Sequence, residues 1–415
     1  MEPCDCPVCL GVRSYREGYF ERSFGQNLNA EALAESVADD LGYCERHGKV
    51  LSREEQHAAS VARVFARAIG RIEPLLHESV LDDRGQRLFF STGRRCPACS
   101  AEEMAAGKLL SPIRQRLRQA NDEHDLDDPL CLHHFQALGT RLPLELRGRI
   151  YQQRIDTLGE VARRLQRDPG AGAAMALGLI GHDAPVRQGR ASLESDGACE
   201  IQDLLSAAHV CPICEALGWA RRHWLRRLRW SARPENREFI WLFAPSCAEH
   251  VADAVAACGE DQQLSIVSYL LPELEEQLRQ KLTIVVHDLM LANQPKPVWY
   301  RPRRKRGQGS ASQTQPATRT VLKCKGCETE AVALERATAH FLDLMRHKYG
   351  RDALARGRGL CLKHLAHVQP VAPHGDVRAF LADLHADRLQ TLRVGLDASP
   401  DMWREAIYRF KGWSL

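Results

Sequence analysis

The sequence predicts an all-α protein, and the prediction rests on the periodicity of its apolar residues and on its composition. Long stretches carry apolar residues at three- and four-residue steps, the period of an amphipathic helix, whereas no stretch shows the sustained alternation of a strand. The 415 residues are 44% apolar and 27% charged, which is ordinary for a globular chain. A pattern of cysteine and histidine that occurs four times divides this helical chain into repeats.

The same periodicity places the expected helices in chain order. They cover residues 33–41, 61–76, 109–117, 146–165, 264–291 and 403–410. Asp168-Pro169-Gly170 ends the fourth of them, and Pro272 marks a kink or a helix start within the fifth. Ser399-Pro400 provides an N-cap and a first-turn proline for the last helix.

The repeated pattern is a C-x-x-C motif followed, after 31 to 34 residues, by a C-x-x-H motif. Random placement of 15 cysteines and 17 histidines would give about 0.5 C-x-x-C and about 0.6 C-x-x-H. The four C-x-x-C and four C-x-x-H motifs, in strict alternation, therefore did not arise by chance placement of cysteine and histidine. The quartets are Cys6, Cys9, Cys44 and His47; Cys96, Cys99, Cys131 and His134; Cys211, Cys214, Cys247 and His250; and Cys324, Cys327, Cys361 and His364.

Three thiolates and one imidazole are the ligands of a closed, tetrahedral structural zinc site. Pro7, Pro97 and Pro212 follow the first cysteine of their pairs, where proline favours the first turn of a helix. The amides of a helix N-terminus lower the pKa of a thiol and stabilise the net negative charge of such a site. We expect each quartet to bind one zinc ion and to close one helical repeat, giving about four zinc ions per chain.

Three details of the ligand sets stay open at this point. Exchange of ligands between neighbouring repeats has the same spacings as closure within one repeat. Cys4 could replace Cys6 in the first site, and His133 lies beside His134 as a spare ligand. The remaining cysteines, Cys199 and Cys258, are expected to be inert buried thiols.

The same quartets allow two other kinds of chemistry. A dithiol redox role is compatible with C-P-x-C, although redox motifs of that kind stand in a strand–helix context. An iron–sulfur cluster can also be bound by cysteines, most often by four of them. A c-type haem needs a histidine directly after the second cysteine, and this is excluded because the residues at those positions are Leu10, Ser100, Glu215 and Glu328.

The repeats and the composition between them predict six segments, two of which are flexible linkers. Residues 1–92 and 93–167 are the first two metal-binding helical repeats, and 204–293 and 321–415 are the third and fourth. Residues 168–203 form a linker with a short Ala/Leu helix. Residues 294–320 form a basic, low-complexity linker that cannot bury a core.

The motifs CPVC with CERH, CPAC with CLHH, CPIC with CAEH, and CKGC with CLKH carry a resemblance. This arrangement resembles uncharacterised bacterial families built on a CPxC-helix-CxxH unit, in which a second long helix follows the histidine. The fourth repeat departs from the pattern because Lys325 replaces the proline. The resemblance implies metal binding and no established activity.

Two basic stretches are candidate contacts for nucleic acid or another partner. The first interleaves arginines with Trp219, Trp224 and Trp230, and the second lies in the 294–320 linker. Cations among aromatic side chains can stack on bases or bind phosphates, but a solvated helix face is the favoured reading of the first stretch. The candidate residues are Arg221, Arg222, Arg226, Arg227, Arg303, Arg304, Lys305 and Arg306.

Composition and missing motifs limit the function class. The net charge of +4 indicates no general attraction to nucleic acid or membranes, and the chain contains no phosphate loop, nucleophile elbow or H-E-x-x-H motif. With no secretion signal or membrane span expected, we predict a cytoplasmic, multi-zinc scaffold. The motifs leave open whether it is an enzyme and indicate no catalytic activity other than electron transfer by a cluster. Its partner would be a macromolecule, protein in preference to nucleic acid, and its oligomeric state is not indicated.

Overall fold

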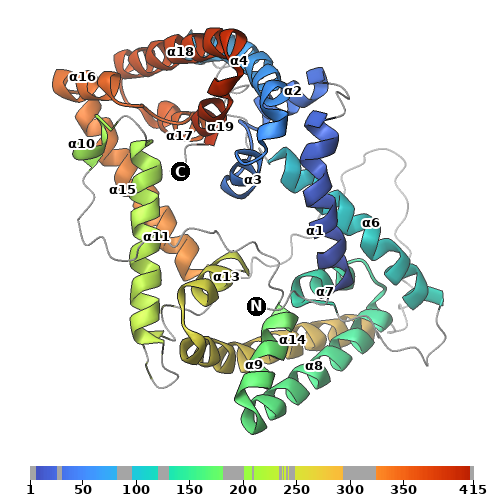
Figure 1. Cartoon of the computed structure of the whole chain (residues 1–415). Coiled ribbons are helices and arrows are strands. Elements are labelled where there is room, and N and C mark those ends of the chain that lie inside the picture. Colours follow the sequence, from blue (N-terminus) through green and yellow to red (C-terminus); the bar gives the residue numbers. More distant parts are fainter. Residues whose placement is uncertain are drawn as a thin grey trace, which may run out of the picture. The chain divides into compact units, whose positions relative to one another are not determined.

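A computed structural model describes residues 6–25, 30–81, 96–119, 130–180, 201–207, 210–232, 248–292 and 324–411, together with residues 236, 238, 239 and 242. Every regular element in these residues is a helix, which confirms the predicted all-α class (Figure 1). Within the same residues, no helix combines the length and the apolar character needed to cross a bilayer.

The helices follow each other closely along the chain. Four short segments, Glu21–Gly25, Glu55–His57, Gln369–Val371 and Pro400–Met402, have π or 3₁₀ geometry. The α-helices are α1 (Pro7–Phe20), α2 (Ala30–Asp39), α3 (Glu45–Leu51), α4 (Ala58–Leu81), α6 (Pro97–Gln119), α7 (Leu132–Gly139), α8 (Leu144–Arg167), α9 (Pro169–Ile180), α10 (Ile201–Leu204), α11 (Pro212–Ser231), α13 (Ala248–Ala257), α14 (Glu260–Ala292), α15 (Lys325–Met345), α16 (Lys348–Arg356), α17 (Leu362–Val368), α18 (Gly375–Ala398) and α19 (Trp403–Lys411).

The helix ends show why these segments fold as they do. Asp168 caps the C-terminus of α8, as its sequence predicts, and its carboxylate accepts a hydrogen bond from the Ala171 N–H at the start of α9. Pro272 lies inside α14 and does not divide it. At the other end of the chain, the Asp401 N–H donates to the Ser399 hydroxyl just before α19.

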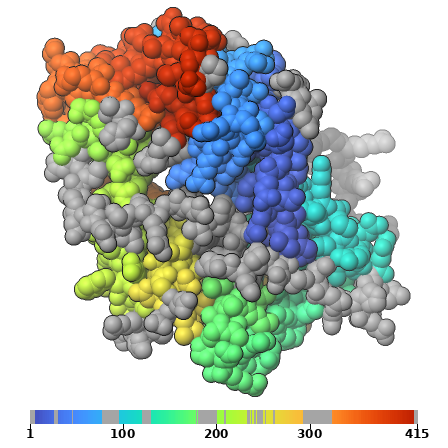
Figure 2. All heavy atoms as spheres, in the orientation of Figure 1, coloured from blue at the N-terminus to red at the C-terminus, as the bar shows by residue number. Residues whose placement is uncertain are grey.

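The chain divides into two compact units, each of which combines parts of several predicted repeats. Unit 2 comprises residues 8–109, 185–227 and 328–415. Its core forms where α18, from the fourth repeat, packs along α4, from the first. In the space-filling view, the orange and red surface of residues 328–411 meets the blue surface of residues 30–81 (Figure 2).

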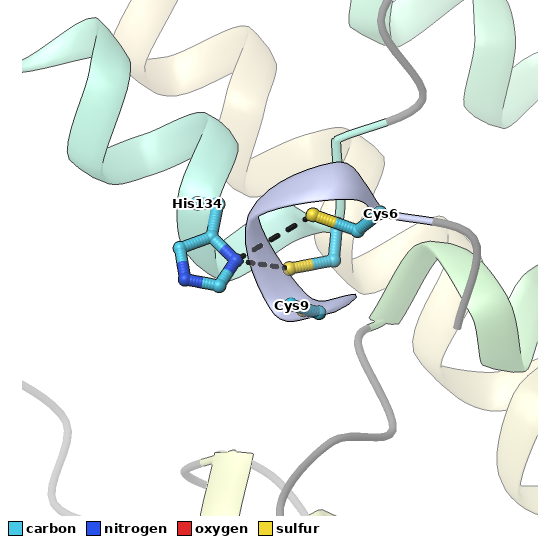
Figure 3. Close-up of side chains that lie close together, drawn as sticks. Cys6, Cys9 and His134 are labelled. Atoms are coloured by element: carbon cyan, nitrogen blue, oxygen red, sulfur yellow. Dashed lines mark hydrogen bonds between the residues drawn. The ribbon is translucent and has the colours of Figure 1, made fainter. Parts of the chain in front are cut away.

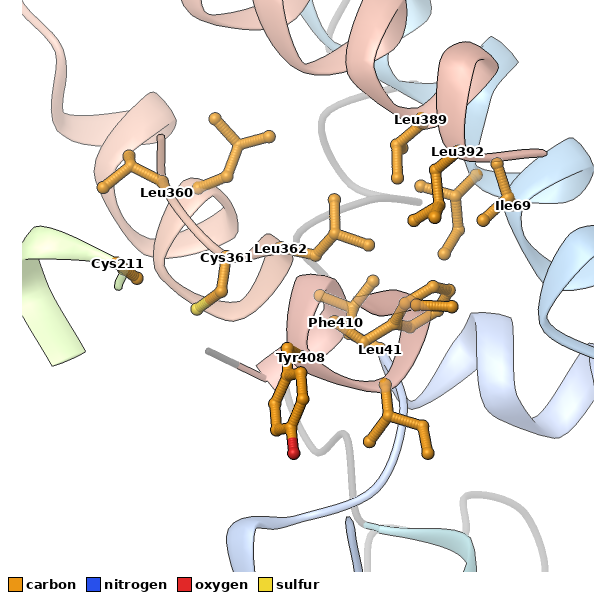
Figure 4. Packing of buried hydrophobic residues seen from close by; sticks show 14 of the residues in the cluster. Leu41, Ile69, Cys211, Leu360, Cys361, Leu362, Leu389, Leu392, Tyr408 and Phe410 are labelled. Carbon is orange, nitrogen blue, oxygen red and sulfur yellow. The ribbon is translucent and has the colours of Figure 1, made fainter. Parts of the chain in front are cut away.

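The core of unit 2 is made of fully buried apolar side chains. Ile69 of α4 faces Leu389 and Leu392 of α18 (Figure 4). The ring of Phe410 on α19 lies edge-on to Phe65, with centroids 5.0 Å apart. Burying one such side chain contributes about 1.5–3 kcal/mol to stability. These contacts therefore stabilise the packing of segments that are more than 300 residues apart in the sequence.

Unit 1 comprises residues 1–7, 110–184 and 228–327. Its core forms where α14, from the third repeat, packs along α8, from the second, and α9 packs against both. Ile155, Leu158 and Val161 are buried on α8, and Val267 and Leu271 are buried on α14. The long helices that follow each C-x-x-H therefore pair with one another across repeats.

The predicted linkers are only partly described. Within 168–203, α9 packs as a regular helix against α8, in the place where the sequence suggests a short Ala/Leu helix. The linker predicted at 294–320 lies outside the described residues. The boundaries of the six predicted segments stay predictions.

Candidate metal centres

The structure gathers the predicted ligands in four groups, and the ligand atoms of each group lie within 4.8 Å of one another. The groups are Cys6, Cys9, Cys131 and His134; Cys44, His47, Cys96 and Cys99; Cys211, Cys214, Cys361 and His364; and His250, Cys324 and Cys327. Cys247, the predicted fourth ligand of the last group, lies outside the described residues, as does Cys4.

The prediction that each repeat closes its own site is wrong. Every C-x-x-C meets described ligands from the C-x-x-H of the neighbouring repeat: the first and second repeats exchange ligands, and His250 of the third repeat joins the cysteine pair of the fourth while Cys361 and His364 of the fourth join that of the third. This is the arrangement that equal spacings left open. The sites therefore join repeats in pairs and do not close single modules.

The length of helix α1, which carries the first cysteine pair at its start, explains why ligands are exchanged between repeats. Helix α1 starts directly after Cys6 and has 14 residues, so it carries the chain about 21 Å away from its own cysteines. The Cys44–His47 turn lies at the far end of that helix, because the ring of Phe20 is 6.3 Å from the ring of His47. A ligand at that end cannot return to the cysteine pair at the start.

The second cysteine pair reaches that far end because α6 runs antiparallel to α1. Arg16 pairs with Glu102, and the space beside Gly11 is filled by the side chain of Leu109. A higher residue number on α1 is thus paired with a lower residue number on α6, which is the pattern of antiparallel helices. The N-terminus of α6 is placed beside the C-terminus of α1 (Figure 1), and its cysteines, Cys96 and Cys99, lie beside His47.

Helices α11 and α15 repeat this antiparallel arrangement in unit 2. Arg221, in the middle of α11, lies 3.6 Å from Glu330, near the start of α15, and the two helices run side by side with α10, which precedes α11, and α16, which follows α15, at the same end (Figure 1). The cysteine pair at the start of α11 therefore meets Cys361 and His364, which follow α15 in the chain.

Each described ligand pair stands on the first turn of a helix, and Pro7, Pro97 and Pro212 predict this for three of the four C-x-x-C pairs. Helices α1, α6, α11 and α15 begin one residue after the first cysteine of a C-x-x-C. Cys44, Cys131 and Cys361 are the N-caps of α3, α7 and α17, in extended backbone conformation. Two helix N-termini with exposed amide donors thus face each group, and their partial positive charge favours thiolates.

The first group stands at the start of α1, where the sulfur of Cys6 faces the ring of His134 and Cys9 lies on the same helical turn (Figure 3). The Nδ1 atom of His134 lies 3.2 Å from the sulfur of Cys131 and 3.6 Å from that of Cys6. All four ligands are buried. Of the two adjacent histidines, it is the predicted His134 that contributes the ligand atom.

The second group has the most regular geometry. The Nδ1 atom of His47 lies 3.3 Å from the sulfur of Cys44 and 3.4 Å from those of Cys96 and Cys99. Burial would lower the pKa of this imidazole, but its contacts with Cys44, Cys96 and Glu102 raise the pKa to about 10. Hydrogen bonding with Cys96 and Cys99 lowers the pKa of the Cys44 thiol. The group therefore stabilises a thiolate and favours a cation at its centre.

The third group repeats this geometry within the core of unit 2. The Nδ1 atom of His364 lies 3.5, 3.1 and 3.3 Å from the sulfurs of Cys211, Cys214 and Cys361. Its pKa is also raised, to about 10: burial lowers it, and the charges of Cys361 and Cys211 more than compensate. Cys361 and Cys211 border the apolar core (Figure 4).

The described part of the fourth group differs in exposure and in packing. The thiol of Cys327 is exposed, whereas Cys324 and His250 are buried. Gly326 lies between the two cysteines, and a Cβ atom there would meet the His250 ring at 2.2 Å. The glycine of the CKGC motif thus gives the imidazole room beside the cysteine pair.

Arginines that are buried or largely buried lie beside two of the groups. Arg154 donates to the backbone oxygen of Leu130 at 2.6 Å; burial lowers its pKa and the charges of Cys131 and Cys6 raise it. Arg409, whose side chain is 12% exposed, lies near Cys361. A zinc ion with three thiolates and a neutral imidazole carries one net negative charge, which such cations balance.

Sequence analysis missed a side chain that contacts His47 at Nε2, the ring nitrogen that does not face the sulfurs. Glu102 of α6 is not among the candidate ligands or contacts named from the sequence, yet its Oε1 atom lies 3.1 Å from the Nε2 atom of His47. The available signal was its spacing, because a residue three positions after Cys99 shares its helix face.

The remaining predicted residues are less informative. Arg221 and Arg222 lie 3.6 Å from Glu330 and 2.7 Å from Glu215, so carboxylates already hold two of the four candidate arginines of α11. Arg303, Arg304, Lys305 and Arg306 lie outside the described residues, as does Cys199. Cys258 is buried, and desolvation raises its pKa to about 11.

Comparisons with models of protein families, with curated proteins and with solved structures found no match to this chain. Of the properties implied by the resemblance to CPxC-helix-CxxH families, the structure supports one: cysteine and histidine groups that could bind metal.

Proposed function

We propose that this chain is a structural zinc protein in which four zinc ions join the first turns of paired helices and support surfaces that bind a macromolecular partner. The observation that carries the proposal is the convergence of cysteine and histidine ligand atoms in four separate groups, each within 4.8 Å. Closed sites of cysteine and histidine are typical of structural zinc.

The distances fit a single tetrahedral ion. With Zn–S bonds of about 2.3 Å and Zn–N bonds of about 2.0 Å, the tetrahedral edges are about 3.8 Å between sulfurs and about 3.5 Å between sulfur and nitrogen. The sulfurs of Cys44 and Cys99 lie 3.6 Å apart, and those of Cys214 and Cys361 lie 3.8 Å apart. The sulfur–nitrogen distances at His47 and His364 are 3.1–3.5 Å.

The alternative is an iron–sulfur or dithiol redox protein that uses the same residues. A cluster places its thiolates on different iron atoms, which spreads the ligands further apart than one ion does, and the short sulfur–sulfur distances favour zinc. A dithiol reaction needs two cysteines, whereas three of these groups bring three thiols and an imidazole together. Reduced thiols suit a cytoplasmic location.

Metal analysis tests the proposal. We expect protein purified without added metal to contain about four zinc ions per chain, to be colourless, and to lack sulfide. Iron with inorganic sulfide and visible absorption would support the redox alternative. Protein that neither retains nor takes up zinc under reducing, anaerobic conditions would contradict the zinc proposal.

We propose a protein as the partner in preference to nucleic acid. The net charge is only +4, and Arg221 and Arg222 lie against carboxylates. We therefore expect no salt-dependent binding of duplex DNA or RNA in a mobility-shift assay near physiological salt. Binding that disappears when Arg226 and Arg227 are both changed to Glu would instead assign the partner to nucleic acid.

A further inference from the structure

The second metal group has a carboxylate behind its histidine, and this carboxylate has a defined role if the proposed zinc site forms. His47 directs Nδ1 toward the sulfurs of Cys44, Cys96 and Cys99 at 3.3–3.4 Å. Its other nitrogen, Nε2, faces the Oε1 atom of Glu102 at 3.1 Å. A neutral imidazole has one N–H, so a ring that binds metal through Nδ1 carries its hydrogen on Nε2.

We propose that Glu102 is a positioning residue of this zinc site. Its carboxylate accepts the Nε2–H of His47, and this hydrogen bond selects the tautomer whose Nδ1 lone pair points at the metal. The bond also fixes the rotation of the ring. Carboxylates in this position raise the basicity of the ligating imidazole and strengthen metal binding.

Two arginines hold Glu102 for this role. Arg16 of α1 and Arg46 of the C-x-x-H turn both donate to its carboxylate, and the residue is only 8% exposed. The Nη2 atom of Arg46 also lies 3.1 Å from His47 Nε2, because both groups donate to the same acceptor. One carboxylate thus ties α1, α3 and α6 together around the ligands.

The third group provides an internal comparison. Its donor set and distances match those of the second group, but the Nε2 atom of His364 is buried and has no hydrogen-bond partner among the described residues. The two sites therefore differ in the support of their histidines. Because Glu102 contacts His47 and not His364, its substitution should affect the second group and leave the third group unchanged.

The test uses the full zinc-loaded chain and the variants Glu102→Gln and Glu102→Ala, with Glu103→Gln as the matched control. Glu103 stands next in the same turn and is exposed. We expect the alanine variant to bind zinc at this site roughly 10–100-fold more weakly and the glutamine variant to be intermediate. Chelator competition followed by thiol alkylation and peptide mapping reads the loss at Cys44, Cys96 and Cys99, while Cys211, Cys214 and Cys361 stay protected.

A spectroscopic signature separates positioning from general support of the fold. Chain loaded with ¹¹³Cd should give one resonance per site, and Glu102→Gln should shift one of them, whereas Glu103→Gln should shift none. Unchanged chelator resistance of Cys44, Cys96 and Cys99 in both Glu102 variants would overturn the role of Glu102, even with about four zinc ions per wild-type chain. A wild-type chain without zinc would instead refute the proposed function itself.

Discussion

Removing the cysteine pair of the first repeat together with the Cys–His pair of the second should cost the protein one zinc ion and not two. Cys6, Cys9, Cys131 and His134 form one group, so the combined change to alanine at all four positions destroys a single site. The zinc content should fall from about four to about three ions per chain. Metal analysis of the purified variant measures this directly.

The matched variant combines the same cysteine pair with the Cys–His pair of its own repeat. Changing Cys6, Cys9, Cys44 and His47 to alanine removes ligands from two groups, and the zinc content should fall to about two ions per chain. Closure within repeats predicts the opposite order, with the larger loss in the first variant. That reversed order would refute the exchanged pairing.

Disulfide mapping gives a second measurement on the unaltered chain, in case a variant does not fold. The sulfurs of Cys44 and Cys99 lie 3.6 Å apart, and those of Cys214 and Cys361 lie 3.8 Å apart. Mild oxidation after zinc removal should therefore join Cys44 to Cys99 and Cys214 to Cys361. Closure within repeats would instead give crosslinks from Cys99 to Cys131.

The sequence predicted the helical class and the first turns that carry the ligands, because both depend on local chemistry. Pro7, Pro97 and Pro212 mark real helix starts, and apolar steps locate α4, α8 and α14. It could not decide which Cys–His pair meets which cysteine pair, because the gaps of 31 to 34 residues are alike. The length of α1 and the antiparallel course of α6 decide that question.

The packing of the long helices could not be read from the sequence for a similar reason. The buried faces of α4 and α18 have the ordinary period of any amphipathic helix. The sequence around Ile69 or Leu389 does not indicate which other helix that residue packs against. A repeat pattern predicts modules that stack with their neighbours, yet α4 of the first repeat packs with α18 of the fourth. Ligand exchange and apolar packing thus connect different pairs of repeats.

Chelation of zinc should therefore destabilise more than one repeat at a time. Cys96, Cys211 and Cys361 belong to the same buried cluster as Phe65 and the other core residues of unit 2. Structural zinc contributes on the order of 10–16 kcal/mol in small peptides, which is comparable to the total stability of a domain. Two of the four groups adjoin this core, so their loss should loosen it as a whole.

We expect a strong chelator under reducing conditions to lower the midpoint of thermal unfolding by roughly 10 °C or more, since 1 kcal/mol shifts that midpoint by about 2–4 °C in domains of this size. The transition should also broaden, because the helices that carry the cysteines lose their attachment before α4 separates from α18. Circular dichroism at 222 nm measures both effects. Chelator saturated with zinc beforehand is the control and should leave the melt unchanged, and added zinc should restore it. A metal-free chain that melts at the same temperature and with the same sharpness would show that the ions do not hold this fold together.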